Sequence, residues 1–406
     1  MKRLLSAMLL LGTSAQAKEF LLSPDTRAKA ASGAGLYYSS GSSSLFYNPA
    51  NLSKLSGNEL KAELSLGSVD YSYTPASDAK AGGISLKAPP VFFGGAMDTP
   101  LGIKLGAAFI PKGTGQASTI DKLPMSVQGS QITVKAVQTD KSFRYGLGAA
   151  AAPMEGLRIG AGILGDVDDQ STLVYGDALD PTVSMSNRGS FQRYTFGGTY
   201  SLDPHWSLAA AYTSALVKEY KGEIKLFQNL GQTASSTSDF LPSEIKLGGQ
   251  LHLKRLTLDL EYSYLRYASG RYFRRTGISN GTIEEKDFVN THNLRVAGSY
   301  RSGRETFIGG FAMLPSSVGY GRFKQQTSLA GTADVEVSGI QMSADFDYVN
   351  QYIFSTGLMH RYSSSTQFGF YGSYLAGRKD VPVFAPNPGQ YRLNVIQLGF
   401  GTEYNL

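Results

Sequence analysis

Cysteine is missing from this 406-residue sequence, and so is any apolar run long enough for a transmembrane helix. Without cysteine, the chain can be neither a lipid-modified lipoprotein nor a disulfide scaffold. Its one notable apolar stretch, Leu4–Leu11, falls well short of the roughly 20 residues that a helix needs to cross a bilayer. A helical membrane protein is therefore excluded, and the fold must be held together by backbone pairing and packing.

The short apolar stretch fits a secretory signal peptide. Lys2 and Arg3 precede it, and the small-residue site Ala15-Gln16-Ala17 follows it, which is the order found in signal peptides. We expect residues 1–17 to be the signal peptide and the mature protein to begin near Lys18.

Charge is also scarce. Asp, Glu, Lys and Arg make up 17% of the residues, whereas the chain holds 47 Gly, 24 Tyr and 21 Phe. A large soluble enzyme would carry more charge, and abundant aromatic residues suit a membrane barrel with aromatic girdles at both interfaces. The net charge of +6 falls to +4 when Lys2 and Arg3 leave with the signal peptide. This bias fits anionic lipid headgroups, and we find no nucleic-acid motif.

Several segments alternate between apolar and polar residues. Between Leu256 and Tyr264 every second residue is Leu or Tyr, and the residues between them include Asp259 and Glu261. A barrel strand alternates in this way, with apolar side chains toward lipid and polar ones toward the lumen. We therefore expect the charged face to be the lumen. A soluble antiparallel sandwich shows the same alternation, so this feature leaves both folds open.

The spacing of the strands favours the barrel. Tight turns such as Lys254-Arg255 alternate with longer connections, notably residues 112–140, 274–284 and 319–346. Short periplasmic turns opposite long outer loops are typical of outer-membrane barrels. We predict an all-β protein whose residues 57–406 form a transmembrane antiparallel β-barrel of about 14 strands. Its expected location is the outer membrane of a Gram-negative bacterium.

The run from Ala31 to Leu55, between the signal peptide and the first strand, lacks a strand pattern. It resembles the amino-terminal plug of the FadL/TodX family of outer-membrane transporters for long-chain fatty acids and hydrocarbons. The shared features are a Ser-Gly-x-Gly start and an Asn-Pro-Ala element: Ser32, Gly33, Gly35, Asn48, Pro49 and Ala50. Because Pro disfavours helix at the residue before it and Asn is a good N-cap, a short helix should begin at Asn48-Pro49. Tyr212-Thr213-Ser214 and Leu241-Pro242-Ser243-Glu244 resemble later strand motifs of the family.

This resemblance implies a plug over residues 18–56 inside the barrel and passive uptake of hydrophobic molecules, above all long-chain fatty acids. Outer loops would capture the molecule, a lumenal pocket would receive it, and movement of the plug would release it sideways through a kinked third strand. Uptake of this kind needs no enzyme activity, cofactor or metal. The expected partners are the hydrophobic small molecule, outer-membrane lipid and lipopolysaccharide, but no nucleic acid, and the expected state is a monomer.

Three groups of residues are candidates for the ligand path. The plug offers the apolar side chains Phe20, Leu21, Leu22, Leu36 and Phe46. Arg144, Lys246 and Arg295 lie on expected inward faces, where they would either bind an acid headgroup or pair with Glu244, Asp259 and Glu261 and only support the wall. In the third strand, Gly106, Ala107 and Ala108 supply the small residues that a kink requires.

Two alternatives remain open. A general diffusion porin would use the inward charges to line a wet channel, although porins usually begin with a strand almost at once. An enzyme barrel would need a catalytic cluster built around one of four histidines, which fall in separate turns and strands: His205, His252, His292 and His360. Asp166, Asp168 and Asp169 are expected to form a solvated rim rather than a calcium site.

Overall fold

The computed structural model describes residues 24–75, 82–88, 91–111, 116–127, 130–175, 181–226, 231–267, 272–275, 282–327, 335–338, 349–381 and 389–406. Four short helices come first in these residues: α3 (Thr26–Ala30), α4 (Gly35–Tyr38), and the 3-10 helices η1 (Gly41–Phe46) and η2 (Pro49–Lys54). The strands that follow are β1 (Glu59–Pro75), β2 (Gly82–Ala88), β3 (Val91–Asp98), β4 (Lys104–Pro111), β5 (Gln116–Val127), β6 (Ser130–Asp140), β7 (Phe143–Met154), β8 (Leu157–Tyr175), β9 (Pro181–Ser201), β10 (Trp206–Thr213), β11 (Leu216–Leu226), β12 (Gly231–Leu241), β13 (Glu244–Leu253), β14 (Leu256–Leu265), β15 (Tyr272–Arg275), β16 (Thr282–Phe288), β17 (Thr291–Ser302), β18 (Glu305–Leu314), β19 (Val318–Thr327), β20 (Val335–Ser338), β21 (Asn350–Arg361), β22 (Thr366–Val381) and β23 (Gly389–Asn405).

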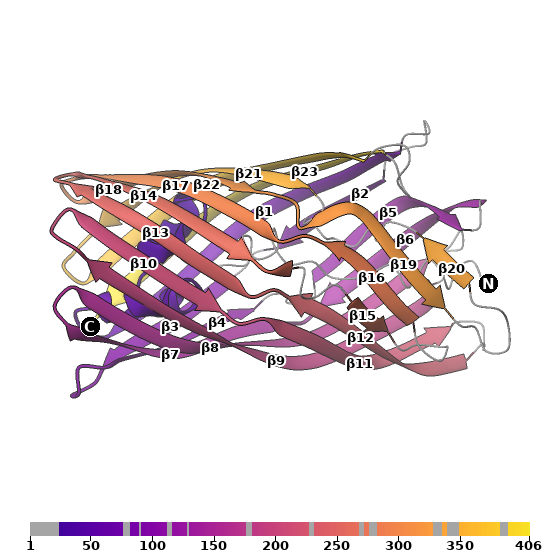
Figure 1. The fold of residues 1–406 in the computed structure, drawn as a ribbon, viewed down its shortest axis with the longest axis horizontal. Helices are drawn as coiled ribbons and strands as arrows, with labels where there is room; N and C mark the ends of the chain where they lie inside the picture. Colours follow the sequence, from indigo (N-terminus) through magenta and orange to yellow (C-terminus); the bar gives the residue numbers. More distant parts are fainter. Residues whose placement is uncertain are drawn as a thin grey trace.

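Fourteen antiparallel strands close into one barrel, in which β23 pairs with β1 (Figure 1). The order around the barrel is β1, β3, β4, β7, β8, β9, β10, β13, β14, β17, β18, β21, β22 and β23. The predicted all-β barrel of about 14 strands is confirmed. Closure joins the first and last strands of the barrel, so that neither is left as a sheet edge in the bilayer.

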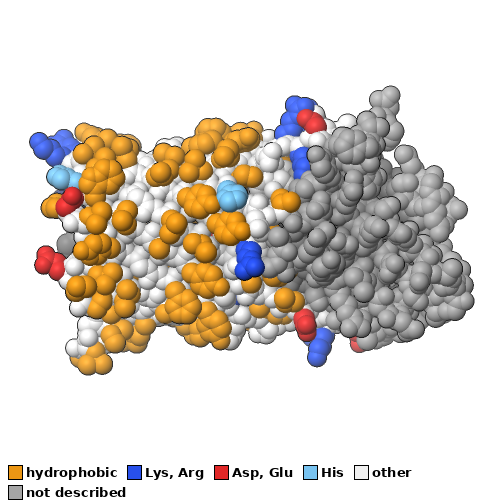
Figure 2. All heavy atoms as spheres, in the orientation of Figure 1, with side chains coloured by type: hydrophobic (Ala, Val, Ile, Leu, Met, Phe, Trp, Pro, Cys, Tyr) orange, Lys and Arg blue, Asp and Glu red, His pale blue; other side chains and the backbone are white. Residues whose placement is uncertain are grey.

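The exterior of the barrel carries a band of large apolar side chains (Figure 2). Along β14, Leu258 is 42% exposed and Leu260 is 52% exposed, whereas Asp259 and Glu261 are buried. Soluble monomers rarely expose so much contiguous apolar surface, but contact with lipid requires it. The barrel is thus built to span a membrane with its apolar face outward. Among the described helices, none has the length and apolar character to cross a bilayer.

Several segments expected to be outer loops are strands. Residues 112–140 contain β5 and β6, and residues 319–346 contain part of β19 and the whole of β20. Strands β15, β16, β19 and β20 form a separate four-stranded sheet. Polar composition suggested loops here, but a ladder needs only backbone partners and continues where a neighbouring chain offers them.

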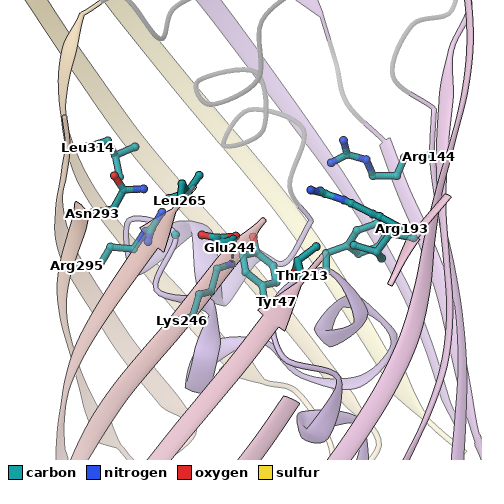
Figure 3. A pocket seen from close by; sticks show the side chains of 13 residues that line it. Tyr47, Arg144, Arg193, Thr213, Glu244, Lys246, Leu265, Asn293, Arg295 and Leu314 are labelled. Atoms are coloured by element: carbon teal, nitrogen blue, oxygen red, sulfur yellow. Dashed lines mark ion pairs between the residues drawn. The ribbon is translucent and has the colours of Figure 1, made fainter. Parts of the chain in front are cut away.

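The segment from Asp25 to Leu55, called the N-terminal segment below, lies inside the barrel (Figures 1 and 3). Leu36, Leu45 and Leu52 have no exposed surface. Its helices pack against inward-facing residues of the wall, including Ala209 and Ala211 beside Leu36. Residues 1–23, which hold the predicted signal peptide and the start of the predicted plug, lie outside the described residues.

Candidate functional site

A buried network of charges ties the start of the N-terminal segment to the first strand. The Lys61 ammonium lies 2.8 Å from an Asp25 carboxylate oxygen and 3.5 Å from a Glu63 oxygen. Glu63 in turn accepts hydrogen bonds from the backbone N–H groups of Asp25 and Thr26, at 2.7 and 2.9 Å. Buried charges are tolerated when they are paired and hydrogen-bonded in this way. The network therefore fixes the position of α3 against β1.

Helix α3 adds a second buried cation. Lys29 is only 1% exposed. Its ammonium donates a hydrogen bond of 2.9 Å to Gln397 Oε1 on β23. Burial lowers the pKa of the Lys29 side chain to about 7, although the nearby Glu63 carboxylate opposes this change. Its charge state therefore changes near neutral pH.

Glycines on the inner wall leave room for the N-terminal segment. A Cβ atom at Gly160 on β8 would lie 2.5 Å from the Pro49 carbonyl carbon, and one at Gly310 on β18 would lie 2.5 Å from the Ala31 carbonyl carbon. Both contacts involve backbone, which cannot swing aside, so only glycine fits. The segment is thus seated closely on opposite parts of the wall.

The Asn-Pro-Ala element forms the helix start that the sequence predicts. Asn48 is the N-cap of η2, and its Oδ1 accepts a hydrogen bond of 3.2 Å from the Ala50 N–H. Its Nδ2 donates to the Leu36 carbonyl and to Thr199 Oγ1 on β9, both at 3.2 Å. One side chain therefore caps the helix and also joins it to the barrel wall.

The Ser-Gly-x-Gly element forms the turn after α3. Ser32 and Gly33 adopt left-handed backbone conformations, with φ of 56° and 84°. Gly35 faces the Tyr47 ring so closely that a Cβ atom would lie 1.9 Å from Tyr47 Cδ1. Gly33 is thus explained by its left-handed backbone conformation, and Gly35 by close packing within the segment.

A cavity of about 80 Å³ lies directly above the N-terminal segment (Figure 3). Four cationic side chains line it from different strands: Arg144, Arg193, Lys246 and Arg295. Four apolar side chains line it as well: Phe46, Leu164, Leu265 and Leu314. This volume suits a few waters or a compact headgroup rather than a whole long acyl chain.

Three of the four cations of this cavity have carboxylate partners. Arg144 Nε lies 2.9 Å from Asp166 Oδ1, and the Lys246 ammonium lies 3.3 Å from Glu244 Oε2. Arg295 lies 3.2 Å from Glu261 Oε1. The expected pairing of Lys246 and Arg295 with Glu244 and Glu261 is therefore present, and an acid ligand would have to share these cations with their partners.

The alternation predicts a charged lumen, but part of the inner wall is apolar. On β21, β22 and β23 the inward side chains Ile353, Leu375 and Leu393 are fully buried. Ile353 stands opposite Leu375 in the ladder, and Leu375 stands opposite Val395. The Ser32 hydroxyl of the N-terminal segment donates a hydrogen bond to the Ile353 carbonyl on this wall. The inner face of the barrel thus carries apolar side chains on β21 to β23 as well as the charged side chains around the cavity.

The kink expected at Gly106, Ala107 and Ala108 is not found. Residues 104–109 pair with β3, and all of β4 pairs with β7, without a register shift. Gly106 serves a different purpose, because a Cβ atom there would lie 2.9 Å from Leu52 Cδ1 in the N-terminal segment. Its small size is explained by close packing against η2.

The third strand is paired on either side of residues 112–115, which lie outside the described residues. Pro111 stands opposite Phe143, and Gln116 stands opposite Asp140.

Other sequence-based expectations have mixed outcomes. Of the predicted ligand-path residues, Phe46, Arg144, Lys246 and Arg295 line the cavity, whereas Leu36 packs on β10, and Phe20, Leu21 and Leu22 lie outside the described residues. Asp166 and Asp168 form no solvated rim, because both are buried and pair with Lys218 at 3.2 and 3.0 Å. The sequence does not single out Arg193 as a site residue, although it lies on the same inward face of β9 as Phe191 and Thr195.

The histidines do not form a cluster. His205 Nδ1 contacts the His252 carbonyl in a turn, His292 contacts the Tyr262 hydroxyl, and His360 contacts Glu305. In the part of the chain that the structure describes, no group of three or more His, Asp or Glu side chains is arranged to hold a metal ion.

Comparisons with solved structures show the same architecture. A Pseudomonas aeruginosa FadL homologue matches with a TM-score of 0.68 and 13% identity, covering 94% of this chain and 98% of its own. The Pseudomonas putida toluene transporter TodX matches with a TM-score of 0.68 and 12% identity, covering 98% and 100%. The Ralstonia pickettii toluene transporter TbuX matches with a TM-score of 0.67 and 12% identity, covering 95% and 99%. No protein-family model and no curated protein matches the chain.

The fold and its contents define a class: a membrane-spanning β-barrel whose lumen holds its own N-terminal segment above the short turns. Within that class the chain has the fold of the FadL-type transporters, over almost its whole length. The resemblance drawn from Ala31–Leu55 is thereby confirmed for the fold.

Proposed function

We propose that this protein carries hydrophobic molecules passively across the outer membrane of a Gram-negative bacterium, without a catalytic step. The observation that carries the proposal is the cavity above the N-terminal segment, which is lined by cations and by the apolar side chains Phe46, Leu164, Leu265 and Leu314. A ligand with an apolar body and a polar end matches this mixed lining.

The filled barrel supports transport of hydrophobes over general diffusion. An apolar solute gains roughly 0.8 kcal/mol per methylene group that it buries. A polar lipopolysaccharide layer keeps such a solute from the bilayer, and a barrel with an apolar inner wall offers a way around that layer. A porin would need an open aqueous path, whereas here the N-terminal segment packs closely against the wall at Gly160 and Gly310.

Long-chain fatty acids are the substrates we propose first. Their carboxylate would lie among Arg144, Lys246 and Arg295, and their chain would lie along the apolar wall. Because each of these cations already has a carboxylate partner, the ligand would be exchanged against internal ion pairs, which suits passage better than tight retention. TodX and TbuX are described as toluene transporters, so neutral aromatic hydrocarbons are the second class to test.

Release would require the N-terminal segment to move and the wall to open. The third strand is the proposed site of lateral release. Its residues Ala107, Ala108 and Phe109 border an apolar depression of about 560 Å³ on the outer face of the barrel. Glycine-rich contacts between segment and wall favour such rearrangement because they bury little side-chain area.

The proposal is tested by measuring uptake of oleate and toluene into proteoliposomes together with ion conductance in planar bilayers. The full protein should carry the hydrophobe and conduct few ions. Deleting residues 18–50 should convert it into a leaky pore, since a barrel of this strand number is too wide for its own side chains to close. A truncated barrel that inserts normally, with unchanged conductance and uptake, would show that the segment is no plug. High conductance of the full protein would favour a porin.

A further inference from the structure

The wall has an interruption between its sixth and seventh strands. β10 pairs with β9 up to Thr213 and Thr195, and the Ser214 N–H then donates a last hydrogen bond of 2.9 Å to the Tyr194 carbonyl. Pairing resumes only where Lys221 of β11 stands opposite Arg188. Within residues 181–226, no ladder pair joins residues 189–193 of β9 to residues 215–220 of the neighbouring segment. The unpaired stretch thus has five residues on one side and six on the other.

Both strands remain paired on their other sides along this stretch. Gly189 to Arg193 continue their ladder with β8, and Leu216 to Tyr220 continue theirs with β12. The interruption therefore belongs to one pair of strands and is not a general loosening of the barrel. Figure 1 shows β9 and β11 side by side in the lower wall.

Side chains, rather than backbone, close the inner face of the interruption. The Phe191 and Tyr220 rings meet edge to face with centroids 5.0 Å apart, and both residues are buried. The Lys218 ammonium lies 5.4 Å from the Phe191 ring centre and 3.0 Å from Asp168, to which the Tyr220 hydroxyl also donates. Phe191 fits here only because Gly189 beside it has no Cβ, which would lie 2.1 Å from the ring.

The interruption connects two environments. On the outer face Tyr194 and Tyr212 are exposed just below it, as in the aromatic girdle at the edge of a membrane, and Val217 is 55% exposed at its centre. On the inner face, Arg193 and Thr213 at its lower end both line the cavity above the N-terminal segment. A path between rings would thus run from the outer leaflet to that cavity.

We propose that this interruption is a side portal through which a hydrophobic molecule at the headgroup level of the outer leaflet exchanges with the cavity. The proposal rests on the transport function proposed above and adds a lateral route distinct from the third strand. Passage requires the Phe191 and Tyr220 rings to rotate apart. Passage between two fully paired strands would instead break several backbone hydrogen bonds at once.

A disulfide across the interruption tests the portal, because the parent chain has no cysteine of its own. Gln192 and Val217 are outward-facing and stand opposite each other if the register of Arg188 and Lys221 is extended. The oxidised double variant Gln192→Cys/Val217→Cys should take up oleate several-fold more slowly than its reduced form. The matched control is Ser186→Cys/Glu223→Cys, a pair that already faces across the intact ladder of the same strands, and its oxidation should change nothing. Equal uptake by both forms of the first variant would overturn the portal.

If the disulfide does not form, a second variant tests the portal. Phe191→Ala removes the inner ring and should increase uptake, whereas Phe370→Ala, which removes an outward-facing ring on β22, should not. Uptake by Phe191→Ala at the parental rate would overturn the portal while leaving the transport function standing. A parent protein that carries neither oleate nor toluene would overturn both.

Discussion

Lys61 on the first strand and Asp25 at the start of the N-terminal segment form a buried ion pair at 2.8 Å. Asp25 also accepts hydrogen bonds from the Ser43 hydroxyl and from the N–H groups of Arg27 and Ala28. Burial alone would raise the pKa of the Asp25 carboxyl, but Lys61 and the Ser43 hydrogen bond hold it below its usual value. One carboxylate thus caps α3, binds the later part of the segment and attaches both to the wall.

Replacing Lys61 with Met should loosen the N-terminal segment. The change leaves the Asp25 charge buried without its partner, which typically costs roughly 3–5 kcal/mol. We expect faster protease cleavage within the segment and higher ion conductance. Asp25→Asn/Lys61→Met, which removes both charges, should recover part of the loss. The control is Lys104→Met, which removes the ion pair with the more exposed Asp98. Equal rates of protease cleavage in Lys61→Met and Lys104→Met would mean that the Lys61–Asp25 ion pair does not hold the segment in place.

Replacing Gly160 with Ala should displace η2. The added Cβ would lie 2.5 Å from the Pro49 carbonyl carbon and 2.6 Å from the Ala50 nitrogen, so backbone must shift. Overpacking of this kind costs roughly 1–3 kcal/mol. Gly249→Ala is the matched control, because nothing lies within 4 Å of a Cβ built there. Conductance should increase for Gly160→Ala alone, and identical conductance of the two variants would contradict the close seating of the segment.

The barrel could be predicted from the sequence because lipid imposes a period of two on every spanning strand. Leu258 and Leu260 face outward and Asp259 and Glu261 face inward, as their spacing indicates. The outer strands could not be predicted, since above the membrane that constraint disappears and polar residues suit strand and loop alike.

Part of the site could also be predicted. Arg144, Lys246 and Arg295 have the parity of inward residues, and they meet at one cavity. The role of Gly106 could not be predicted, because glycine suits a bend and a close contact equally well, and only the position of Leu52 decides between them. The interruption at Phe191 depends on pairing between β9 and β11, which neither strand encodes alone.

Replacing Arg144, Lys246 and Arg295 together with Gln should reduce uptake of oleate and leave uptake of toluene unchanged. Only a carboxylate ligand needs these cations, and charge-assisted hydrogen bonds each contribute roughly 1.5–3 kcal/mol. Both substrates should be measured in the same proteoliposomes, so that a folding defect would lower both rates. Unchanged oleate uptake by a folded variant would assign the three cations to support of the wall.

Lys29 should make the docking of the N-terminal segment depend on pH. Its pKa is lowered by burial from 10.5 to about 7 in the docked state, with Glu63 opposing the change. Below pH 7 the ammonium is charged in both the docked and the released state, so docking must bury a charge and is least stable. As the pH rises from about 7 toward 10.5, the docked state loses its proton first and docking becomes more stable. The gain is at most roughly 1.4 kcal/mol per pH unit.

Protease cleavage within residues 24–55 should therefore slow as the pH rises from about 7 to about 9. The Lys29→Met variant should lose most of this dependence. A remainder from Lys54 should persist, since burial, helped by Arg158, lowers the pKa of that side chain to about 8. The comparison must use a protease whose own activity is corrected at each pH with an unfolded substrate. If parent and Lys29→Met show the same pH profile, the Lys29 ammonium does not control docking.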